Sequence, residues 1–424
     1  MDARPGNRGT VIVGASQSGT QLATSLREAG YTAPITIIGE EPHAPYQRPP
    51  LSKGFLDGTT DEYSLEFRSR AYYVERDISL VLGERVTSAA LDEDVTRGGR
   101  VTLASGRVID FDRLALAVGA RARRLSVEGS ELPGVLYLRD LADAVALRDG
   151  LASLPAVVII GGGFIGLEIA AAARSRGCAV TILEAADRLM GRAVAPVVSQ
   201  FYLQAHERRG ADVRVAVTID RILGDPSGVT GVELAGGEVI PATLVVVGIG
   251  VIPCLELAEE LGLDCRGGVL VDEIAQTSDP RVLAVGDVAM MPHPSGRAGL
   301  VRLESVQNSV EHAKVAAATI AGEPHPYRTV PWFWSDQGDL KLKIAGISTG
   351  YDQVVLRGVP DSESFSVLYY AEGDLLACDS VNAVADYLAA RRALEHGINI
   401  PSAIAADSST PLKAALVPTS LVKG

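Results

Sequence analysis

A glycine loop between a strand and a helix constrains this chain more than any other feature of its sequence. The β-branched run Val157–Ile160 leads into the loop G-G-G-F-I-G at residues 161–166, and the alanine-rich helical segment Leu167–Arg174 follows. Such a loop lets backbone N–H groups approach a pyrophosphate, which the positive end of the helix dipole also attracts. The pattern predicts a dinucleotide-binding fold with its fingerprint glycines at Gly161, Gly163 and Gly166.

An acidic residue closes this strand–helix–strand pattern. The strand-like run Val180–Leu183 ends at Glu184. A carboxylate there can accept hydrogen bonds from the free ribose hydroxyls of NAD, whereas it repels the 2′-phosphate of NADP. Glu184 therefore favours NADH, although the nearby Arg188 keeps NADPH open as an alternative.

A second, weaker copy of the pattern opens the chain. The run Thr10–Val13 precedes the loop G-A-S-Q-S-G, which begins at Gly14 and ends at Gly19. Ser16 stands where the fingerprint has its middle glycine. A serine there still allows a phosphate to approach the backbone if its φ is negative, although its side chain crowds the site.

The segments after this loop complete the copy. Thr20–Ala29 has helical composition, and the strand-like run Ile35–Ile38 leads to Glu40, which could accept hydrogen bonds from an adenosine ribose.

Another strand-like run ends at Gly286-Asp287, where an aspartate on a turn can hydrogen-bond a polyol. The two copies together predict an α/β protein with two Rossmann-like dinucleotide-binding domains.

Charge and apolar runs argue against two other classes of protein. The formal net charge of −13 is the opposite of the basic footprint that a nucleic-acid-binding protein needs. The apolar run Leu244–Pro253 is far shorter than the roughly 20 residues that cross a bilayer, so it predicts a buried strand. Residues 1–10 contain no apolar stretch typical of a signal peptide. We therefore expect a cytoplasmic protein that binds neither nucleic acid nor membranes.

The cysteines indicate no metal site. Cys178, Cys254, Cys265 and Cys378 are too far apart to form a C-x-x-C pair. This spacing argues against a zinc ribbon, a disulfide scaffold and a local redox disulfide, so we expect ordinary reduced thiols.

Further motifs, spread over nearly the whole chain, resemble those of one family. They are P-Y-Q-R-P-P-L-S-K at 45–53, L-A-L-A-V-G-A-R at 114–121, Y-L-R at 137–139, T-S-D-P at 277–280, V-G-D at 285–287, E-S-V-Q-N at 304–308 and P-W-F-W-S-D-Q at 331–337. With the two glycine loops, they make the chain similar to the oxygenase-coupled, NADH-dependent ferredoxin reductases. These form the putidaredoxin reductase-like branch of the FAD-dependent pyridine nucleotide-disulfide oxidoreductase superfamily.

The resemblance implies which residues hold the two cofactors. The FAD site would comprise Gly14, Ser18, Gly19, Glu40, Glu41, Arg48, Lys53, Val86, Arg139, Asp287, Val306 and Trp332. The nicotinamide nucleotide would be bordered by Gly161, Gly163, Ile165, Gly166, Glu168, Glu184, Arg192 and Gly250.

The resemblance also implies an interleaved domain organisation. The FAD-binding domain would comprise residues 1–118 and 244–322, the NAD-binding domain 119–243, and an α+β C-terminal domain 323–424. The segment Gly119–Pro133, with no apolar period, has the character of a hinge between the first two.

Alternation of apolar and polar residues supports the last domain independently. It occurs in Lys341–Ile347 and Ser364–Tyr370, where it predicts antiparallel strands. Val381–Leu394 has helical spacing instead.

The chemistry implied by the resemblance is electron transfer in two stages. FAD would accept hydride from NADH and pass single electrons to a [2Fe–2S] ferredoxin serving a monooxygenase or dioxygenase. Lys53 would stabilise negative charge on the reduced ring, and Glu168 would hold Lys53 and position the nicotinamide. Trp332 would cover one flavin face or shield it from oxygen. Disulfide reductases of the superfamily have a cysteine pair near the first fold, whereas Glu40–Gly58 has none. This difference predicts that electrons leave the protein.

We expect a transient, electrostatically assisted complex with the ferredoxin and a monomer or weak homodimer otherwise. Because ferredoxins are commonly acidic, the acidic chain needs a local basic patch, for which Arg68, Arg70 and Arg76 are candidates. Two alternatives remain. One is rubredoxin reductase or monodehydroascorbate reductase activity on the same scaffold; the other is a redox-responsive interaction protein like apoptosis-inducing factor.

Overall fold

The computed structural model describes residues 8–418 and divides the chain into two compact units. The first unit is Met1–Gln47, Glu62–Arg121 and Ile252–Pro331, and the second is Arg48–Asp61, Ala122–Val251 and Trp332–Gly424. Residues 1–7 and 419–424, the outer ends of the predicted first and last domains, lie outside the described residues. Residues 1–7 also make up most of the segment that we expect not to be a signal peptide. The division into three domains stays a prediction.

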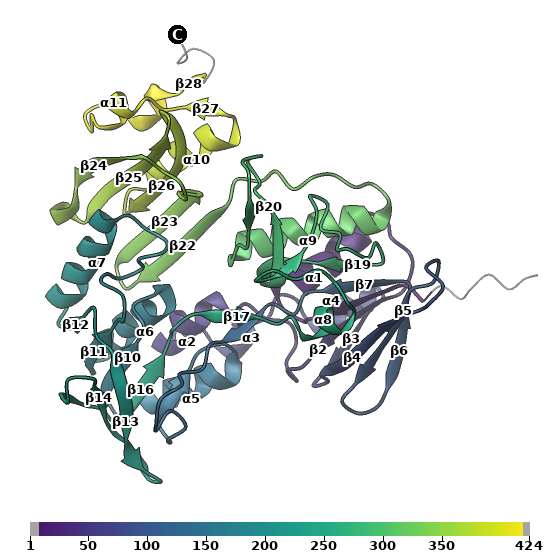
Figure 1. The fold of residues 1–424 in the computed structure, drawn as a ribbon, viewed down its shortest axis with the longest axis horizontal. Coiled ribbons are helices and arrows are strands. Elements are labelled where there is room, and N and C mark those ends of the chain that lie inside the picture. The colour runs from purple at the N-terminus through teal and green to yellow at the C-terminus, as the bar shows by residue number, and fades with distance from the viewer. Residues whose placement is uncertain (1–7, 419–424) are drawn as a thin grey trace, which may run out of the picture. The chain divides into compact units, whose positions relative to one another are not determined.

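The first unit is built on a five-stranded parallel sheet (Figure 1). Its strands pair in the order β19–β7–β1–β2–β3, which are Val282–Ala284, Arg113–Leu116, Thr10–Val13, Ile35–Gly39 and Ile78–Leu82. Every residue of β1 is buried, as is typical of a parallel strand that is covered on both faces. The strands predicted before and after the first glycine loop are confirmed as β1 and β2.

Helices and short sheets complete this unit. The helix α1 (Gln17–Glu28) packs against α9 (Val306–Ala321). An antiparallel sheet is formed by β4 (Val86–Leu91), β5 (Gly99–Leu103) and β6 (Val108–Phe111). The remaining elements are α3 (Glu62–Leu65), α4 (Arg70–Glu75), α8 (Glu256–Glu260), β18 (Val269–Leu270), β20 (Ala289–Pro292) and β21 (Leu300–Val301).

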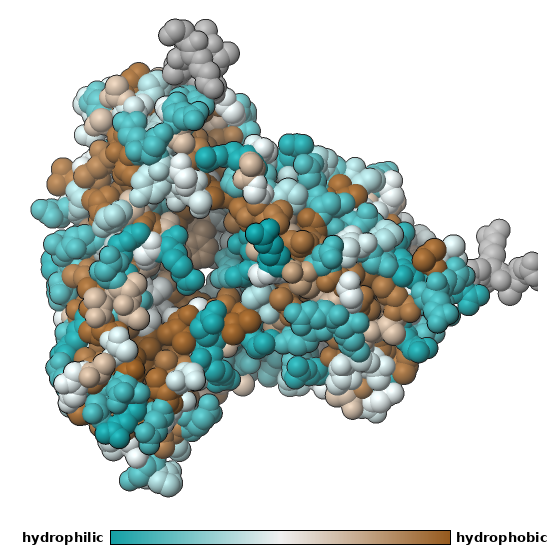
Figure 2. Space-filling model, in the orientation of Figure 1, coloured by the Kyte–Doolittle hydropathy of each residue, from teal (hydrophilic) through white to brown (hydrophobic). Residues whose placement is uncertain are grey.

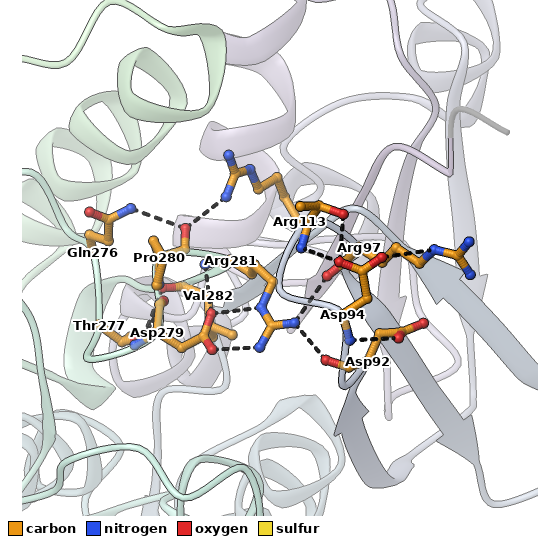
Figure 3. A network of polar contacts seen from close by, with 11 residues as sticks. Asp92, Asp94, Arg97, Arg113, Gln276, Thr277, Asp279, Pro280, Arg281 and Val282 are labelled. Carbon is orange, nitrogen blue, oxygen red and sulfur yellow. Dashed lines mark hydrogen bonds and ion pairs between the residues drawn. The ribbon is translucent and has the colours of Figure 1, made fainter. Parts of the chain in front are cut away.

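A buried arginine ties the β4–β5 loop to the parallel sheet (Figure 3). Arg281, which precedes β19, donates to both carboxylate oxygens of Asp279 at 2.9 and 2.7 Å. It also donates to the carbonyl oxygens of Asp92 and Arg97 in the loop, at 2.8 and 3.0 Å. These hydrogen bonds hold the pKa of Asp279 below its usual range. One side chain therefore joins two segments far apart in the sequence.

The second unit contains another five-stranded parallel sheet (Figure 1). Its strands pair in the order β12–β11–β10–β16–β9, which are Asp212–Arg214, Ala179–Leu183, Ala156–Ile160, Leu244–Val247 and Val135–Tyr137. Its helices are α5 (Leu141–Leu151), α6 (Phe164–Ser175) and α7 (Pro196–Arg208). An antiparallel sheet of β13 (Ile219–Asp225), β14 (Gly228–Leu234) and β15 (Val239–Pro241) adjoins them.

The C-terminal part of this unit is an antiparallel sheet backed by a helix. Its strands pair in the order β22–β23–β26–β25–β24, which are Trp332–Gln337, Leu340–Gly346, Asp374–Val381, Ser364–Ala371 and Gln353–Val359. The helix α10 (Val384–Glu395) packs on β26 and β23, and α6 packs on β22. Buried residues of the parallel sheet and of this sheet, such as Ile159 and Val367, share one hydrophobic core. The short elements are α2 (Gly54–Asp57), α11 (Ser402–Ala405), β27 (Ile398–Asn399) and β28 (Val417–Pro418).

The predicted fold class is confirmed, with two local corrections. The run Leu244–Pro253 is not one strand: β16 ends at Val247, and β17 (Val251–Pro253) begins after a break that contains Gly250, whose φ is 97°. The predicted helix Val381–Leu394 begins too early, because Val381 is the last residue of β26. A left-handed residue, Asn382, separates strand from helix with a φ of 49°, and helical periodicity alone could not reveal that turn.

The exposed face drawn in Figure 2 mixes hydrophilic and hydrophobic side chains. Within residues 8–418, no helix combines the length and the apolar character needed to span a bilayer.

Candidate active site

The second glycine loop has the geometry that its fingerprint predicts. Gly161 adopts a φ of 110°, and a β-carbon there would collide with the Gly248 carbonyl oxygen. A β-carbon on Gly166 would collide with the Gly161 carbonyl oxygen, so α6 lies tightly against the loop. Gly163 faces open space instead, because its β-carbon would meet no heavy atom within 4 Å. The loop therefore has room for a phosphate at its middle glycine, and a pyrophosphate fits these residues.

Glu184 lies against this loop. Its Oε2 accepts a hydrogen bond from the Gly162 N–H at 2.6 Å, and its Oε1 accepts one from the Ala186 N–H at 2.7 Å. These contacts fix a carboxylate beside the start of α6, where no side chain caps the helix. The adenosine ribose of a nucleotide on the loop would meet this acceptor.

Two arginines and an isoleucine lie near the second loop. Arg188 donates to the Val194 carbonyl oxygen at 2.7 Å and to Ser199 Oγ at 3.0 Å, so its guanidinium is engaged within its own segment. Arg192 is exposed, and its Nη2 lies 3.5 Å from where a β-carbon on Gly250 would be. Ile165, in the first turn of α6, is 44% exposed.

The first glycine loop, in the other unit, has the same construction. A β-carbon on Gly14 would collide with the Ala117 carbonyl oxygen, and one on Gly19 would collide with the Gly14 carbonyl oxygen. Ser16 has a φ of −123°, which satisfies the condition that the sequence sets for a serine at this position. No side-chain hydrogen bond caps the start of α1, so its N-terminus also suits a phosphate.

The start of α9 lies beside that of α1. A β-carbon on Gly286, whose φ is 74°, would collide with Ser18 Oγ on α1 and come within 3.3 Å of Ser309 Oγ on α9. The structure thus brings together Ser18, the turn that contains Asp287, and Val306, the first residue of α9. These residues were predicted to line the same cofactor.

Three more predicted FAD residues lie at strand ends of this unit. The Glu40 side chain is 70% exposed, with Arg85 Nη1 3.9 Å from its Oε1. Glu41 accepts a hydrogen bond from the Tyr46 hydroxyl at 2.5 Å. Val86 is buried at the start of β4.

Four residues predicted for FAD belong to the second unit instead. Arg48 donates a hydrogen bond to the Arg139 carbonyl oxygen. Trp332 opens β22, with the Trp334 ring 5.7 Å and the Arg391 guanidinium 5.3 Å from its ring centre. Lys53, the fourth, ends the short 3₁₀ helix Pro49–Ser52.

Lys53 forms an ion pair with a buried carboxylate. Lys53 Nζ lies 2.6 Å from Glu168 Oε2, and the Glu168 side chain is only 4% exposed. Ser52 donates to the same oxygen at 2.5 Å, and Ser335 donates to Oε1 at 2.7 Å. The predicted contact between Lys53 and Glu168 is present. Neither serine was predicted from the sequence, although each stands inside a motif that supports the resemblance.

The candidate basic patch is present only in part. Arg68, Arg70 and Arg76 are all exposed, and two of them lie over the Tyr72 ring, Arg76 at 3.9 Å and Arg68 at 5.4 Å. The same segment also exposes Glu66, Glu75 and Asp77, among other acids. The role of these arginines in docking stays a prediction.

Neither a metal site nor a disulfide occurs in the part of the chain that the structure describes. No group of three or more histidine, cysteine or acidic side chains there could hold a metal ion. Cys178 and Cys378 are buried, Cys254 and Cys265 are partly exposed, and none is paired with another.

Two dinucleotide folds and a lysine paired with a buried glutamate define a nucleotide-dependent oxidoreductase. The chain belongs to the pyridine nucleotide-disulphide oxidoreductase family, whose model matches residues 8–319, and a reductase C-terminal model matches residues 332–416. Membership implies a flavin and NAD(P)H as the redox groups. The family resemblance predicted from the sequence is confirmed.

Several relatives are named as reductases of small electron-transfer proteins or of oxygenase systems. Rhodocoxin reductase of Rhodococcus erythropolis is 44% identical over 406 residues, which cover 96% of this chain and 94% of the relative. A ferredoxin reductase for the CYP199A2 system of Rhodopseudomonas palustris has a solved structure with a TM-score of 0.90 and 42% identity, covering 96% of this chain and 99% of that one. The covalent complex of putidaredoxin reductase with putidaredoxin matches with a TM-score of 0.91 and 37% identity, covering 96% and 98%.

Proposed function

We propose that this chain is an FAD-containing, NADH-dependent ferredoxin reductase that supplies single electrons to a [2Fe–2S] ferredoxin of an oxygenase system. The observation that most supports the proposal is the ion pair of Lys53 with Glu168, at 2.6 Å. Glu168 lies on α6, the helix that starts at the nucleotide loop. When bound, the nicotinamide would supply a hydride and the flavin would convert it into two single-electron transfers. The protein would supply binding, orientation and charge.

The choice of NADH over NADPH rests on Glu184 and Arg188. The Glu184 carboxylate lies beside the loop and would repel a 2′-phosphate. Arg188, which could have bound that phosphate, donates to the Val194 carbonyl oxygen and to Ser199. The choice of FAD rests on the first loop, whose uncapped helix start suits a pyrophosphate, and on Glu40, which is exposed at the end of β2 where an adenosine ribose would lie.

Lys53 would act as a fixed cation next to the flavin. Its ammonium group is held by a carboxylate with very little solvent exposure, so its position and charge are set before any negative charge develops on the ring. Glu168 would hold this ammonium and help to orient the nicotinamide. Trp332, with Trp334 and Arg391 against its ring, would cover one face of the flavin.

The acceptor is inferred from the relatives and from the cysteines. Rhodocoxin reductase and putidaredoxin reductase are named for the proteins they reduce, and the latter has been solved in complex with putidaredoxin. Residues 40–58 contain no cysteine that could accept electrons internally. We place the reaction in the cytoplasm because NADH is a cytoplasmic electron donor.

Anaerobic stopped-flow mixing of the purified, FAD-loaded protein with NADH and, separately, NADPH tests this proposal. We expect rapid flavin reduction by NADH, slower reduction by NADPH, and reoxidation by a [2Fe–2S] ferredoxin. Turnover with rubredoxin or monodehydroascorbate but not with ferredoxin would show that the proposed acceptor is wrong. Slow reduction accompanied by a shift to dimers would favour a redox-responsive interaction protein.

A further inference from the structure

We infer that a one-directional chain of buried hydrogen bonds, from His206 through Gln337 to Ser335, positions the Glu168 carboxylate and through it the Lys53 ammonium. This inference rests on the proposed function, since it concerns the setting of the cation that would face the flavin. Ser335 is a positioning residue in this account, because it contacts Glu168 and not the reacting atoms.

The chain of contacts crosses three elements of the second unit. His206 Nε2 on α7 lies 2.8 Å from Gln337 Oε1 at the end of β22. Gln337 Nε2 lies 3.4 Å from Ser335 Oγ, and Ser335 Oγ lies 2.7 Å from Glu168 Oε1 on α6. Ser335 and Gln337 are two residues apart on one strand, so their side chains leave the same face.

The direction of these hydrogen bonds follows from chemistry at the Glu168 end. A carboxylate can only accept, so the Ser335 hydroxyl must donate its single proton to Glu168. Ser335 can then only accept from Gln337, which fixes the amide with Nε2 toward the serine and Oε1 toward His206. His206 must therefore donate from Nε2. Every donor in the chain points toward the carboxylate.

Burial makes this arrangement consequential. Ser335, Gln337 and His206 are 0%, 1% and 2% exposed, so water cannot replace a lost partner. Burial also lowers the pKa of His206, which favours the neutral ring. Such surroundings strengthen the short hydrogen bonds at the two ends of the chain, at 2.8 and 2.7 Å, whereas the link from Gln337 to Ser335, at 3.4 Å, is the weakest.

The strand that contains Ser335 is itself fixed to the nucleotide-binding helix. The rings of Phe164 on α6 and Phe333 on β22 lie 4.7 Å apart, and α6 packs along β22. Ser335 thus approaches Glu168 from the reductase C-terminal region, while Ser52 and Lys53 approach the other oxygen. We infer that this region completes the setting of the ion pair, in addition to any part in contacting the partner.

Ser335→Ala tests the inference, with Ser335→Thr as the variant that keeps the hydroxyl. In FAD-loaded protein, we expect Ser335→Ala to lower the limiting rate of flavin reduction at saturating NADH by about tenfold or more. The flavin midpoint potential should fall as well, because a less fixed cation stabilises the reduced ring less, whereas the dissociation constant for NADH should change little. Ser335→Thr should restore both the rate and the potential.

Ser380→Ala is the matched control, because Ser380 is a buried serine of the same sheet that contacts Ser366, at 2.9 Å, and not Glu168. It should leave the rate and the potential unchanged. Gln337→Met removes the middle member of the hydrogen-bond chain without adding charge. We expect it to lower the rate of flavin reduction and the midpoint potential, but by less than Ser335→Ala does.

Two results would overturn the inference. One is a Ser335→Ala protein with the flavin-reduction rate and midpoint potential of the unsubstituted protein. The other is an unchanged flavin-reduction rate in Gln337→Met, which would show that Gln337 and His206 do not help to position Glu168. A failure of the proposed function looks different, since the unsubstituted protein would then bind no FAD or would not be reduced by NADH.

Discussion

Replacing Gly163 by alanine should separate nucleotide binding from folding. Gly163 has a φ of −83° and a ψ of 177°, which alanine adopts readily, and the space before its missing β-carbon is open. At such a position, Gly→Ala stabilises a protein by about 0.4–1 kcal/mol, because it restricts the unfolded chain. The thermal midpoint of Gly163→Ala should therefore stay the same or rise.

Nucleotide binding should respond in the opposite way. The added methyl group would occupy the space in which the backbone meets the pyrophosphate, and one charge-assisted hydrogen bond is worth about 1.5–3 kcal/mol. At 1.36 kcal/mol per factor of ten, the dissociation constant for NADH should increase about 10- to 150-fold. Stopped-flow flavin reduction over a range of NADH concentrations measures this constant directly.

Gly166→Ala is the matched comparison. Its β-carbon would collide with the Gly161 carbonyl oxygen inside the fold, so the variant should lose about 1–3 kcal/mol of stability and melt at a lower temperature. Wild-type affinity for NADH in Gly163→Ala, or equal destabilisation by the two substitutions, would refute the assignment of roles to these glycines.

Four further predictions concern specificity, stability and docking. Glu184→Ala should lower the preference for NADH over NADPH in kcat/KM by about tenfold, and an unchanged ratio would contradict the role of its charge. Arg281→Met should lower the free energy of unfolding by about 3 kcal/mol, measured by urea denaturation, because Asp279 loses both guanidinium hydrogen bonds and two carbonyl oxygens lose their donor. Burial raises the pKa of Asp379 to about 7, so the folded chain retains a proton that the unfolded chain loses near pH 4. The stabilising contribution of this proton is present below about pH 4 and is lost as the pH rises to about 7. The free energy of unfolding of Asp379→Asn should therefore increase, relative to that of the unsubstituted protein, as the pH rises through this window. A difference between the two proteins that is independent of pH would contradict this. Raising the salt concentration should slow ferredoxin reduction but not flavin reduction by NADH, and insensitivity to salt would exclude electrostatic docking.

The parallel-sheet elements were predictable because local chemistry determines them. The buried β-branched runs at Thr10–Val13 and Val157–Ile160 lie next to glycine loops, whose spacing is typical of a strand–loop–helix unit that binds a dinucleotide. Both runs are strands in the structure. The contact of Lys53 with Glu168 was predicted only through family resemblance, because the two residues are separated by more than a hundred positions. No pattern of spacing in one sequence reveals such a pair.

Other features depend on tertiary contacts that a sequence pattern does not encode. The hydrogen bonds of Ser335 and Gln337 depend on the pairing and packing of β22, and a serine in a strand has no signal of its own. The engagement of Arg188 with Val194 and Ser199 likewise depends on the path of a loop. Sequence could only leave that arginine as a candidate for binding a 2′-phosphate.

In the proposed function, NADH reduces a flavin in this chain next to the Lys53–Glu168 pair. The most direct test is the limiting rate of flavin reduction by NADH in FAD-loaded Lys53→Met, measured anaerobically beside the unsubstituted protein. We expect fast reduction of the unsubstituted protein and a decrease of about tenfold or more in the variant, because one oriented charge beside the ring is lost. Equal rates in the two proteins would contradict it.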